Sequence, residues 1–343
     1  MEYQKDIPLS TLTTLRLGGN ARYVVEVSSR DDLIAAVAFA REQALPWFIL
    51  GGGSNVVARG NFAGLIILDR IREFEVTAED ATTKTYRIGA GEVWDSVVER
   101  LVDAGLSGVE MMSAIPGYTG STPIQNVGAY GQEIADTLIE LEAYDTNSNR
   151  FVTLSADDCD FSYRNSIFKD PHTRHHLITS ITLKLSALPP APPFYPSLAK
   201  YLEDHPVETC SAAALREAVI AIRAGRLPDP QLVANAGSFF KNPIVQKPQA
   251  DALLRRFPDA PHWELPDNKT KFAAGWLIEQ AGLKSYTAHG LQIYPKNALV
   301  VTNLSATSSR DLEQFATEII SMIQEKFGIT LEQEPEDLKG DTN

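Results

Sequence analysis

Residues 113–131 read SAIPGYTGSTPIQNVGAYG and contain four glycines, two prolines and no charged side chain. Surface loops usually carry Lys, Glu or Asp, and this stretch also lacks the apolar period of a helix or strand. Its glycines let the backbone approach a ligand, and successive N–H groups can form a concave nest that holds a phosphate without a cation. Because Ile115, Ile124 and Val127 argue against disorder, we predict a ligand-holding loop, with a rigid turn cluster under a sheet edge as the alternative.

A second glycine-rich stretch lies upstream at residues 46–55, PWFILGGGSN, where a short apolar strand leads into three glycines. Gly51 and Gly53 match the first two glycines of a G-x-G-x-x-G fingerprint, but Val56 takes the third position and no helix is expected to follow. A Rossmann dinucleotide site is therefore disfavoured. A pyrophosphate held between two glycine-rich loops remains open, as does a plain hairpin turn.

Composition narrows the class of protein. The 343 residues are 44% hydrophobic and 22% charged, which is enough for two or three domains with their own cores. A net charge of −13 without clustered Lys and Arg argues against a nucleic-acid surface, so an anionic ligand must be met by local groups. We expect neither a signal peptide nor a membrane span. Cys159 and Cys210 are far apart, which suggests neither a disulfide framework nor a thiolate metal site and fits a reducing cytoplasm.

Hydrophobic periodicity predicts three units. The first has strands at 22–27, 46–50 and 65–68 and a helix at 31–44 capped by Ser29. The second has strands at 72–77, 85–90, 138–144, 150–154 and 177–185 and a helix at 92–105. Five prolines in 188–198 predict an extended linker. The third unit has helices at 211–224, 270–281 and 309–327 and strands at 290–293 and 298–301, before an acidic tail that we expect to be partly ordered at most.

Two polar residues stand in surroundings that suggest chemistry. Ser238 in NAGSFFKNP has no His or Asp at triad spacing, but a hydroxyl in an apolar site can donate a proton, particularly if Lys241 helps; a structural turn is the alternative. Arg164 in CDFSYRNSIFK has apolar and aromatic neighbours, and a buried guanidinium requires an anionic or carbonyl partner. An internal salt bridge to one of the nearby aspartates is the alternative for Arg164.

His172, His175 and His176 have a spacing that invites a metal interpretation. No carboxylate or cysteine is expected to complete a ligand set, and KDPHTRHH reads as a polar loop before a strand. We therefore expect no metal.

Six spaced motifs together resemble one family. They are LGGGSN (50–55), IPGYTGSTPIQNVGAYG (115–131), YRNSIFK (163–169), RLPDP (226–230), NAGSFFKNP (235–243) and AAGWLIEQAGLK (273–284). They are similar to the UDP-N-acetylenolpyruvoylglucosamine reductases of peptidoglycan synthesis, in the longer branch with a substrate-covering tyrosine, and the resemblance runs from about Thr14 to about Glu334. NAGSFFKNP and PIQNVGAYG are the most specific motifs, whereas GGGSN alone indicates only the wider flavin-binding superfamily.

The resemblance implies an α+β fold, with a two-subdomain FAD-binding module of the PCMH or vanillyl-alcohol-oxidase-like type and a smaller α+β substrate-binding domain. The implied boundaries are FAD-binding subdomains at 1–70 and 71–187, a linker at 188–198, a substrate domain at 199–328, and a C-terminal segment at 329–343 that returns a catalytic carboxylate. The reductant of the FAD would be NADPH. The FAD would be bound noncovalently, because Ser54 and Asn55 stand where some relatives in the flavin superfamily have a histidine that attaches the flavin. The substrate would be UDP-N-acetylglucosamine enolpyruvate, and the enzyme a cytoplasmic monomer.

The resemblance also assigns residues. Ser238 would be the proton donor, Arg164 would polarise the substrate carboxylate, and Glu334 would be the catalytic carboxylate, although aligning the family's proline selects Glu336 instead and a solvated acidic tail is the alternative. The implied cofactor-binding residues are Gly51, Gly52, Gly53, Ser54, Asn55, Ile115, Pro116, Gly117, Gly120, Ser121, Ile124, Gly128 and Tyr163. The implied substrate-binding residues are Tyr195, Arg223, Arg226 (often Lys in the family), Lys241, Asn242, Lys284 and Asn297.

Two other functions remain open at this point. The chain could be a different flavin oxidase or dehydrogenase of the same superfamily that acts on a free sugar or alcohol. It could also be a nucleotide-sugar binding protein without catalysis, which the irregular acidic tail would allow.

Overall fold

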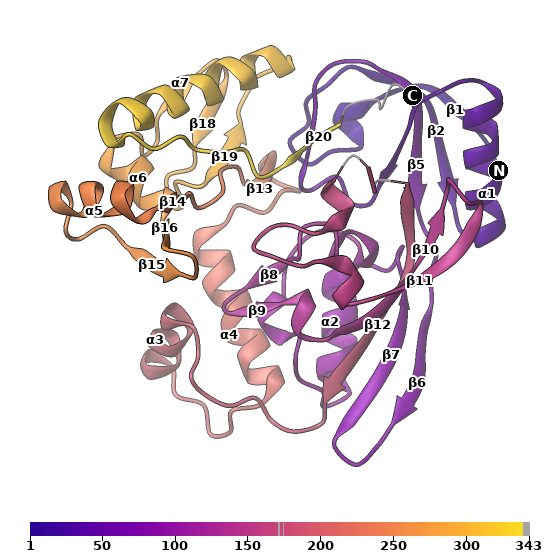
Figure 1. Cartoon of the computed structure of the whole chain (residues 1–343), viewed down its shortest axis with the longest axis horizontal. Coiled ribbons are helices and arrows are strands. Elements are labelled where there is room, and N and C mark those ends of the chain that lie inside the picture. The colour runs from indigo at the N-terminus through magenta and orange to yellow at the C-terminus, as the bar shows by residue number, and fades with distance from the viewer. Residues whose placement is uncertain (171, 174, 339–343) are drawn as a thin grey trace.

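The computed structural model describes residues 1–338 except 171 and 174 and arranges them in three units (Figure 1). In the first unit a sheet has the order β1-β2-β5-β3, formed by β1 (Gln4–Pro8), β2 (Asn20–Val27), β5 (Phe62–Asp69) and β3 (Trp47–Leu50). Helix α1 (Arg30–Glu42) covers it, and the Ser29 side chain accepts the Asp32 N–H as the predicted cap. A short strand β4 (Val56–Ala58), not a helix, follows the GGGSN turn.

The second unit is an antiparallel sheet of order β11-β10-β12-β7-β6. Its strands are β6 (Phe74–Glu79), β7 (Thr83–Gly89), β10 (Leu138–Asp145), β11 (Arg150–Ser155) and β12 (His176–Ser186), and β8 (Gly128–Ala129) pairs with β9 (Gln132–Glu133) beside it. Helix α2 (Trp94–Asp103) buries its apolar face, including Trp94 and Leu101, against this sheet. Short 3-10 turns lie at Leu9–Thr11, Glu110–Met112, Thr119–Ser121, Ile134–Asp136, Asp157–Cys159 and Ile167–Lys169.

The predicted linker and the start of the predicted third unit differ from the structure. Pro196 does not extend the chain but begins helix α3 (Pro196–Asp204), because its fixed φ suits the first helical position. Helix α4 (Ala212–Arg226) packs with α3 and with Met111 of the second unit, and the Arg216 guanidinium binds the Asp95 carboxylate of α2 at 2.6 Å. Residues 196–226 therefore pack on the second unit rather than with the C-terminal third, as Figure 1 also shows.

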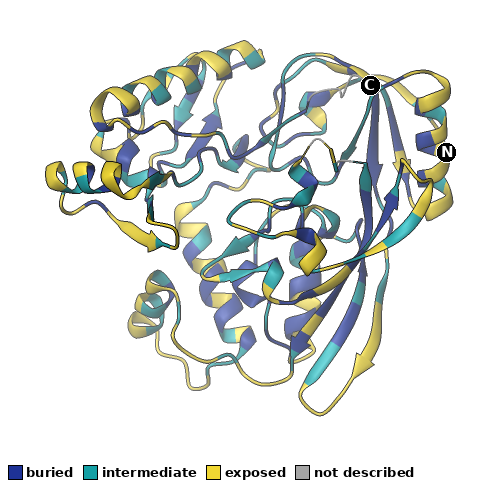
Figure 2. Cartoon of the chain, viewed as in Figure 1, coloured by how far each residue is buried: buried dark blue, intermediate teal, exposed yellow. Residues whose placement is uncertain are grey.

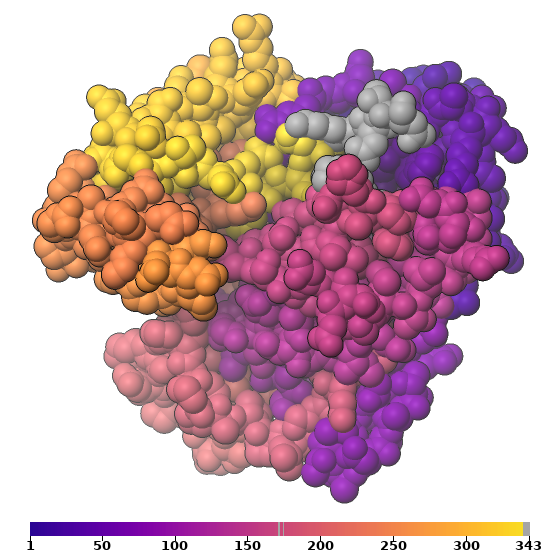
Figure 3. Space-filling view, viewed as in Figure 1, coloured from indigo at the N-terminus to yellow at the C-terminus, as the bar shows by residue number. Residues whose placement is uncertain are grey.

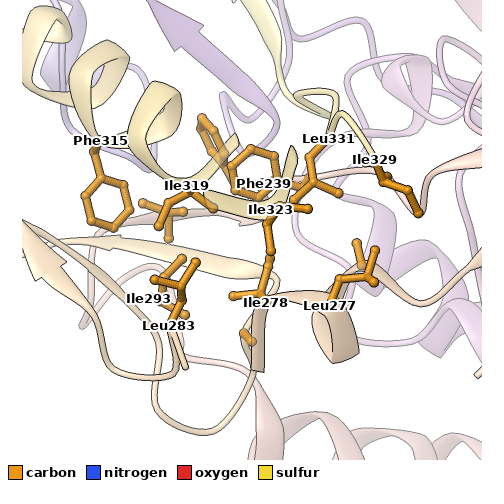
Figure 4. Close-up of a cluster of buried hydrophobic side chains, with 14 of the residues drawn as sticks. Phe239, Leu277, Ile278, Leu283, Ile293, Phe315, Ile319, Ile323, Ile329 and Leu331 are labelled. Carbon is orange, nitrogen blue, oxygen red and sulfur yellow. The ribbon is translucent and has the colours of Figure 1, made fainter. Parts of the chain in front are cut away.

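The third unit has two small sheets, of order β13-β19-β18-β17 and β14-β16-β15. The strands are β13 (Asn235–Ser238), β14 (Ile244–Gln246), β15 (His262–Leu265), β16 (Lys269–Phe272), β17 (Thr287–Ala288), β18 (Leu291–Ile293) and β19 (Val300–Asn303), with α5 (Lys247–Arg256), α6 (Ala274–Gln280) and α7 (Ser309–Phe327) around them. The helix predicted from residue 270 begins only at Ala274, since β16 precedes it. Figure 4 shows Phe315, Ile319 and Ile323 of α7 directed into the core beside Phe239.

The apolar faces of the sheets and helices point inward, and exposed residues lie on the outer helix faces and loops (Figure 2). The predicted α7 bounds are confirmed, with Gly328 at φ 71° as its C-cap. No described helix has the length and apolar character that crossing a membrane requires.

The C-terminal segment crosses back from the third unit to the first. Glu334 N–H donates to Phe239 O at 2.9 Å, and strand β20 (Glu336–Leu338) pairs in parallel with β4. The tail is thus ordered as far as Leu338, further than its acidic composition suggested. Residues 339–343 of the predicted C-terminal segment lie outside the described residues.

Candidate active site

The two glycine-rich loops predicted from the sequence meet in space. A Cβ added to Gly52 would lie 2.9 Å from the Gly117 Cα, so only glycine allows the loops to approach this closely. The Ser54 hydroxyl donates to Pro116 O at 2.9 Å, and the Asn55 amide donates to the Gln125 side chain at 2.6 Å. These contacts join two segments about sixty residues apart into one wall of the cleft.

The long loop is held rigidly from below. The Ala114 N–H donates to the Asp95 carboxylate at 2.6 Å, and Gly120 N–H donates to Ala90 O at 2.9 Å. A Cβ at Gly120 would lie 2.5 Å from the Ala90 Cβ, which explains why that position is glycine. The loop is therefore a preformed surface and not a disordered segment.

Two cavities adjoin along this wall and form one elongated cleft. The first, of about 140 Å³, is lined mainly by apolar and aromatic side chains, among them Trp47, Phe168 and Leu177. The second, of about 240 Å³, is lined by the loop of residues 51–55 and by charged groups. The walls common to both are Phe48, Ile49, Gly51, Ser121, Ile124 and Glu336. Figure 3 shows the C-terminal segment running between the third unit and the other two.

The charged end of the cleft brings together the three predicted catalytic residues. Ser238, Arg164 and Glu334 all line the second cavity. Arg164 donates through Nε to Glu334 Oε1 at 3.0 Å and through NH2 to Gly128 O at 3.1 Å, and its backbone has φ 55°. Burial raises the pKa of the Glu334 carboxyl, which is only 8% exposed, although the Arg164 charge acts against that rise.

The partner of Arg164 distinguishes the two tail glutamates. Within the described part of the chain, Arg164 forms no salt bridge to an aspartate near it in sequence. Its ion-pair partner is Glu334, 170 residues further along the chain. Glu336 also borders the cleft, but its backbone lies in β20, where its N–H donates to Asn55 O at 2.9 Å. Both glutamates thus border the cavity that Ser238 lines, and Glu334 is the one whose side chain accepts a hydrogen bond from Arg164.

Ser238 ends strand β13 with its neighbours on either side fixed. Gly237 has φ 70°, and its N–H donates to the Asn235 side chain at 2.9 Å. Phe239 and Phe240, which follow, are buried in the core of the third unit. The hydroxyl of Ser238 is thus placed at the boundary between a packed core and the cleft.

A partly exposed arginine lines the same cavity. Arg223 of α4 has its Nε atom buried with no hydrogen-bond partner within the described part of the chain. Burial lowers the pKa of the Arg223 guanidinium, while the charges of Tyr130 and Asp95 and a hydrogen bond with Tyr130 act in the opposite direction. The Tyr130 ring meets the Tyr195 ring edge to face at 5.9 Å. A guanidinium with a buried, unpaired donor atom beside a cavity can bind an anion there.

Most of the predicted cofactor-binding residues line one of the two cavities. Those of the cofactor set that border the cleft are Gly51, Gly52, Gly53, Ser54, Asn55, Ile115, Pro116, Gly120, Ser121, Ile124 and Gly128. Gly117 packs behind them, and the Tyr163 ring lies under the Lys271 ammonium at 4.5 Å.

Several predicted substrate residues make protein contacts away from the cavity wall. The Asn242 side chain accepts the Ala274 N–H at the start of α6, and the Asn297 side chain accepts the Leu299 N–H. Lys241 and Lys284 pair with Glu332 at 3.6 Å and with Glu279 at 3.3 Å. Arg226 ends α4 next to the Arg223 region.

Sequence reasoning missed a buried acid at the apolar end. Asp69 ends strand β5, lines the first cavity and is 5% exposed, and its carboxylate accepts the Ile71 N–H at 2.9 Å. Burial raises its pKa to about 7. Its position at the end of the apolar run FAGLIILD was the one signal that could have found it.

The expectation for the histidine group was wrong in one respect. Asp145 stands opposite His176 in the β10–β12 register and lies together with His175 and His176, so a carboxylate distant in sequence completes the group. His172 is not part of this cluster.

The cleft fits the dinucleotide that the motifs imply. Within the described part of the chain, the N–H groups of residues 51–55 donate no hydrogen bond to a protein acceptor. These residues line the second cavity, and Gly51 lines the first cavity as well. Backbone donors of this kind can hold a diphosphate without a cation. The apolar chamber on one side and the polar chamber on the other suit the two ends of such a ligand.

Comparisons with known proteins agree with this geometry. A family model described as the C-terminal domain of UDP-N-acetylenolpyruvoylglucosamine reductase matches residues 229–338, and one described as an FAD binding domain matches residues 21–155. A UDP-N-acetylenolpyruvoylglucosamine reductase from Ralstonia nicotianae is 40% identical over 331 residues, covering 96% of this chain and 97% of the relative. A second such reductase, from Cupriavidus pinatubonensis, is 41% identical over 335 residues, which cover 97% of this chain and 98% of the relative.

A solved structure confirms the predicted fold class. The crystal structure of UDP-N-acetylenolpyruvylglucosamine reductase from Thermus caldophilus superposes with a TM-score of 0.68 at 23% identity, covering 98% of this chain and 99% of that one. Together with the FAD-binding match, it shows an α+β fold with an FAD-binding module.

Proposed function

The chain belongs to the family of UDP-N-acetylenolpyruvoylglucosamine reductases, and from this premise we propose how its cleft performs the reaction. The protein is an FAD-containing oxidoreductase that reduces UDP-N-acetylglucosamine enolpyruvate in peptidoglycan precursor synthesis. The proposal concerns the reductant, NADPH, and the residues that act. The observation that carries it is the placing of Ser238, Arg164 and Glu334 on the cavity that the loop 51–55 also lines.

The cofactor would be held by backbone. The N–H groups of 51–55 and the rigid loop around Gly117 and Gly120 would bind its diphosphate, and the apolar chamber would take one end. Ser54 and Asn55 offer no group for covalent attachment, so binding is noncovalent. When bound, FAD would supply the redox chemistry, namely transfer of a hydride from NADPH to the β carbon of the enol ether.

The chain's own residues stabilise charge on the substrate. As the β carbon gains the hydride, negative charge develops toward the substrate carboxylate, and the Arg164 guanidinium is in place to bind it. Glu334 fixes the orientation of Arg164 through the 3.0 Å hydrogen bond. Because burial raises the pKa of Glu334, its carboxyl also holds a proton more readily than an exposed glutamate and can donate a hydrogen bond to the same anion.

Ser238 would then deliver the proton to the α carbon. Ser238 lines the cavity, and the buried Phe239 and Phe240 that follow it limit access of water from the core side. General acid catalysis of this kind contributes about 10²–10⁴-fold to a rate. The product would be UDP-N-acetylmuramate.

The nucleotide part of the substrate would be held where Arg223 lines the second cavity. Arg223, with its unpaired Nε, would bind the diphosphate, and Tyr195 would cover it from α3. Arg226, Lys241, Asn242, Lys284 and Asn297 remain predicted contributors from the resemblance. We further propose that the enzyme works as a cytoplasmic monomer on these small molecules. Neither alternative weighed from the sequence, another flavin oxidase or an inactive binding protein, is favoured by a specific observation.

The test separates the two half-reactions of a Ser238→Ala variant under anaerobic conditions. Flavin bleaching by NADPH should keep its rate, whereas reoxidation by the enolpyruvyl nucleotide should slow by about 10²-fold or more. A Ser238→Cys variant, which keeps a weak donor, should recover part of the rate. Equal half-reactions in the alanine variant and the native enzyme would show that Ser238 is not the acid.

A further inference from the structure

We propose that Asp145, His175 and His176 form a binding site for one divalent transition-metal ion of the Zn²⁺ class, separate from the catalytic end of the cleft. Asp145 ends strand β10, and His176 begins strand β12 directly opposite it in the sheet register. His175 precedes the strand and turns its ring to the same side. One ligand atom from each of the three residues lies within 4.8 Å of the other two.

The two imidazole rings lie close together beside the Asp145 carboxylate. Their centroids lie 4.2 Å apart, and His175 Nε2 lies 3.7 Å from Asp145 Oδ1. His176 Nδ1 is buried and has no hydrogen-bond partner within the described part of the chain. A buried nitrogen of this kind costs free energy unless something binds it, and a metal ion bound to its lone pair would do so.

The Asp145 carboxylate is held in one orientation by the turn that follows it. The Ser148 hydroxyl donates to it at 2.6 Å, and the Asn147 N–H donates to it at 2.9 Å. A metal site gains affinity when hydrogen bonds of this kind orient its ligands.

The donor set selects the kind of ion. Two imidazole nitrogens and one carboxylate suit Zn²⁺, Co²⁺, Ni²⁺ or Cu²⁺, whereas Ca²⁺ and Mg²⁺ prefer oxygen ligands throughout. Tetrahedral Zn²⁺ with bonds of about 2.0 Å places its ligand atoms roughly 3.3 Å apart, so small side-chain rotations would close the group around the ion. Three protein ligands leave at least one position for water.

A simple ion pair between His175 and Asp145 is the competing explanation. It accounts for the approach of those two side chains, but it leaves the buried Nδ1 of His176 without a partner within the described part of the chain, and it does not explain why the two rings lie only 4.2 Å apart. A metal accounts for all three residues together. The ion would join the end of β10 to the start of β12, and His176 also borders the apolar chamber of the cleft.

The experiment is isothermal titration of the tag-free, chelator-treated FAD holoenzyme with ZnCl₂. We expect one ion per chain, with affinity weakened at least about tenfold in each of His175→Gln, His176→Gln and Asp145→Asn. Two controls should bind as the native enzyme does. His172→Gln alters a histidine of the same segment, and His289→Gln removes a histidine that pairs with a single carboxylate, Glu318, at 2.7 Å.

Flavin content of each variant reports whether it is folded. Absence of stoichiometric binding, or equal affinity in the native enzyme and all three ligand variants, would overturn the proposal. Should a ligand variant lose its flavin, zinc-edge anomalous diffraction from native crystals soaked in ZnCl₂ decides the matter. A peak between Asp145, His175 and His176 is the expected result, and a peak only elsewhere contradicts it.

Discussion

At the scale of single residues, long-range pairing decides what each side chain does. Glu334 and Glu336 both fit the sequence pattern, and only the folded chain shows that Glu334 accepts a hydrogen bond from Arg164, which is 170 residues away in sequence. Asp145 could not be joined to His175 and His176 from sequence, since a sheet register brings them together across thirty residues. Ser238 and Arg164, by contrast, stand within local motifs and were predictable from them.

The buried Asp69 makes stability depend on pH in a predictable way. Its folded-state pKa of about 7 lies above the ordinary value of 3.8, so ionisation costs more in the folded than in the unfolded chain. Stability associated with the neutral carboxyl is complete below pH 3.8 and is lost as pH rises to about 7. The isosteric Asp69→Asn variant cannot ionise at this position, so its stability should not fall for this reason as pH rises.

Urea unfolding of flavin-free protein at several pH values would measure how the free energy of unfolding depends on Asp69. From pH 5 to pH 8 the stability of Asp69→Asn relative to native protein should rise by roughly 3 kcal/mol, at 1.36 kcal/mol per pH unit up to pH 7. An Asp6→Asn variant, which alters an exposed aspartate of β1, serves as the control. A native-to-variant difference that stays constant over this range would mean that Asp69 ionises normally.

At the scale of elements, the C-terminal segment is fastened on both sides of Glu334. Arg59, which follows β4, donates through Nε to Asp337 at 2.7 Å and through NH2 to Gln333 at 2.7 Å. The Gln333 amide in turn donates to Asp337 at 3.0 Å. This clasp, together with β20, ties the tail of the third unit to the first unit. Arg59 is therefore a positioning residue for Glu334.

Removing the clasp should impair the second half-reaction selectively. In Arg59→Gln we expect reoxidation by the enolpyruvyl nucleotide to slow about ten- to hundredfold, since small misplacement of a catalytic group has effects of this size. Flavin reduction by NADPH should change little. Arg22→Gln, on an exposed face of β2, is the matched control. A clasp variant with both rates intact would show that β20 alone holds Glu334.

Element prediction succeeded where periodicity was strong and failed where packing overrode it. The stripe of α7 fixed its bounds, and Ser29 was correctly identified as a cap. The proline-rich segment was read as extended although Pro196 starts a helix. Residues 270–273 were assigned to a helix although they belong largely to β16, since AAGWLIEQ begins its apolar period only after that strand.

At the scale of the whole molecule, the cleft is assembled from all three units. Glycine loops come from the first two, Arg223 from a helix packed on the second, and Ser238 and Glu334 from the third and its returning tail. The sequence indicated three units and the family's motifs, but not that residues 196–226 would pack on the second unit. That placement depends on the contact of Arg216 with Asp95 and on the apolar cluster around Met111.

The same arrangement explains how an acidic protein binds anions. The net charge of −13 gives no general attraction for a nucleotide. Arg164 and Arg223 supply local positive charge inside the cleft. In our proposal the N–H groups of 51–55, which have no protein acceptor within the described part of the chain, bind the cofactor diphosphate. Binding therefore depends on a few buried groups and on main chain, as the composition required.

The most direct test is the visible spectrum of the purified protein under anaerobic conditions. The protein should be yellow, with flavin bands that bleach on adding NADPH and return on adding UDP-N-acetylglucosamine enolpyruvate. A colourless protein that takes up no FAD, or a reduced flavin that the enolpyruvyl nucleotide leaves unchanged, would contradict the account.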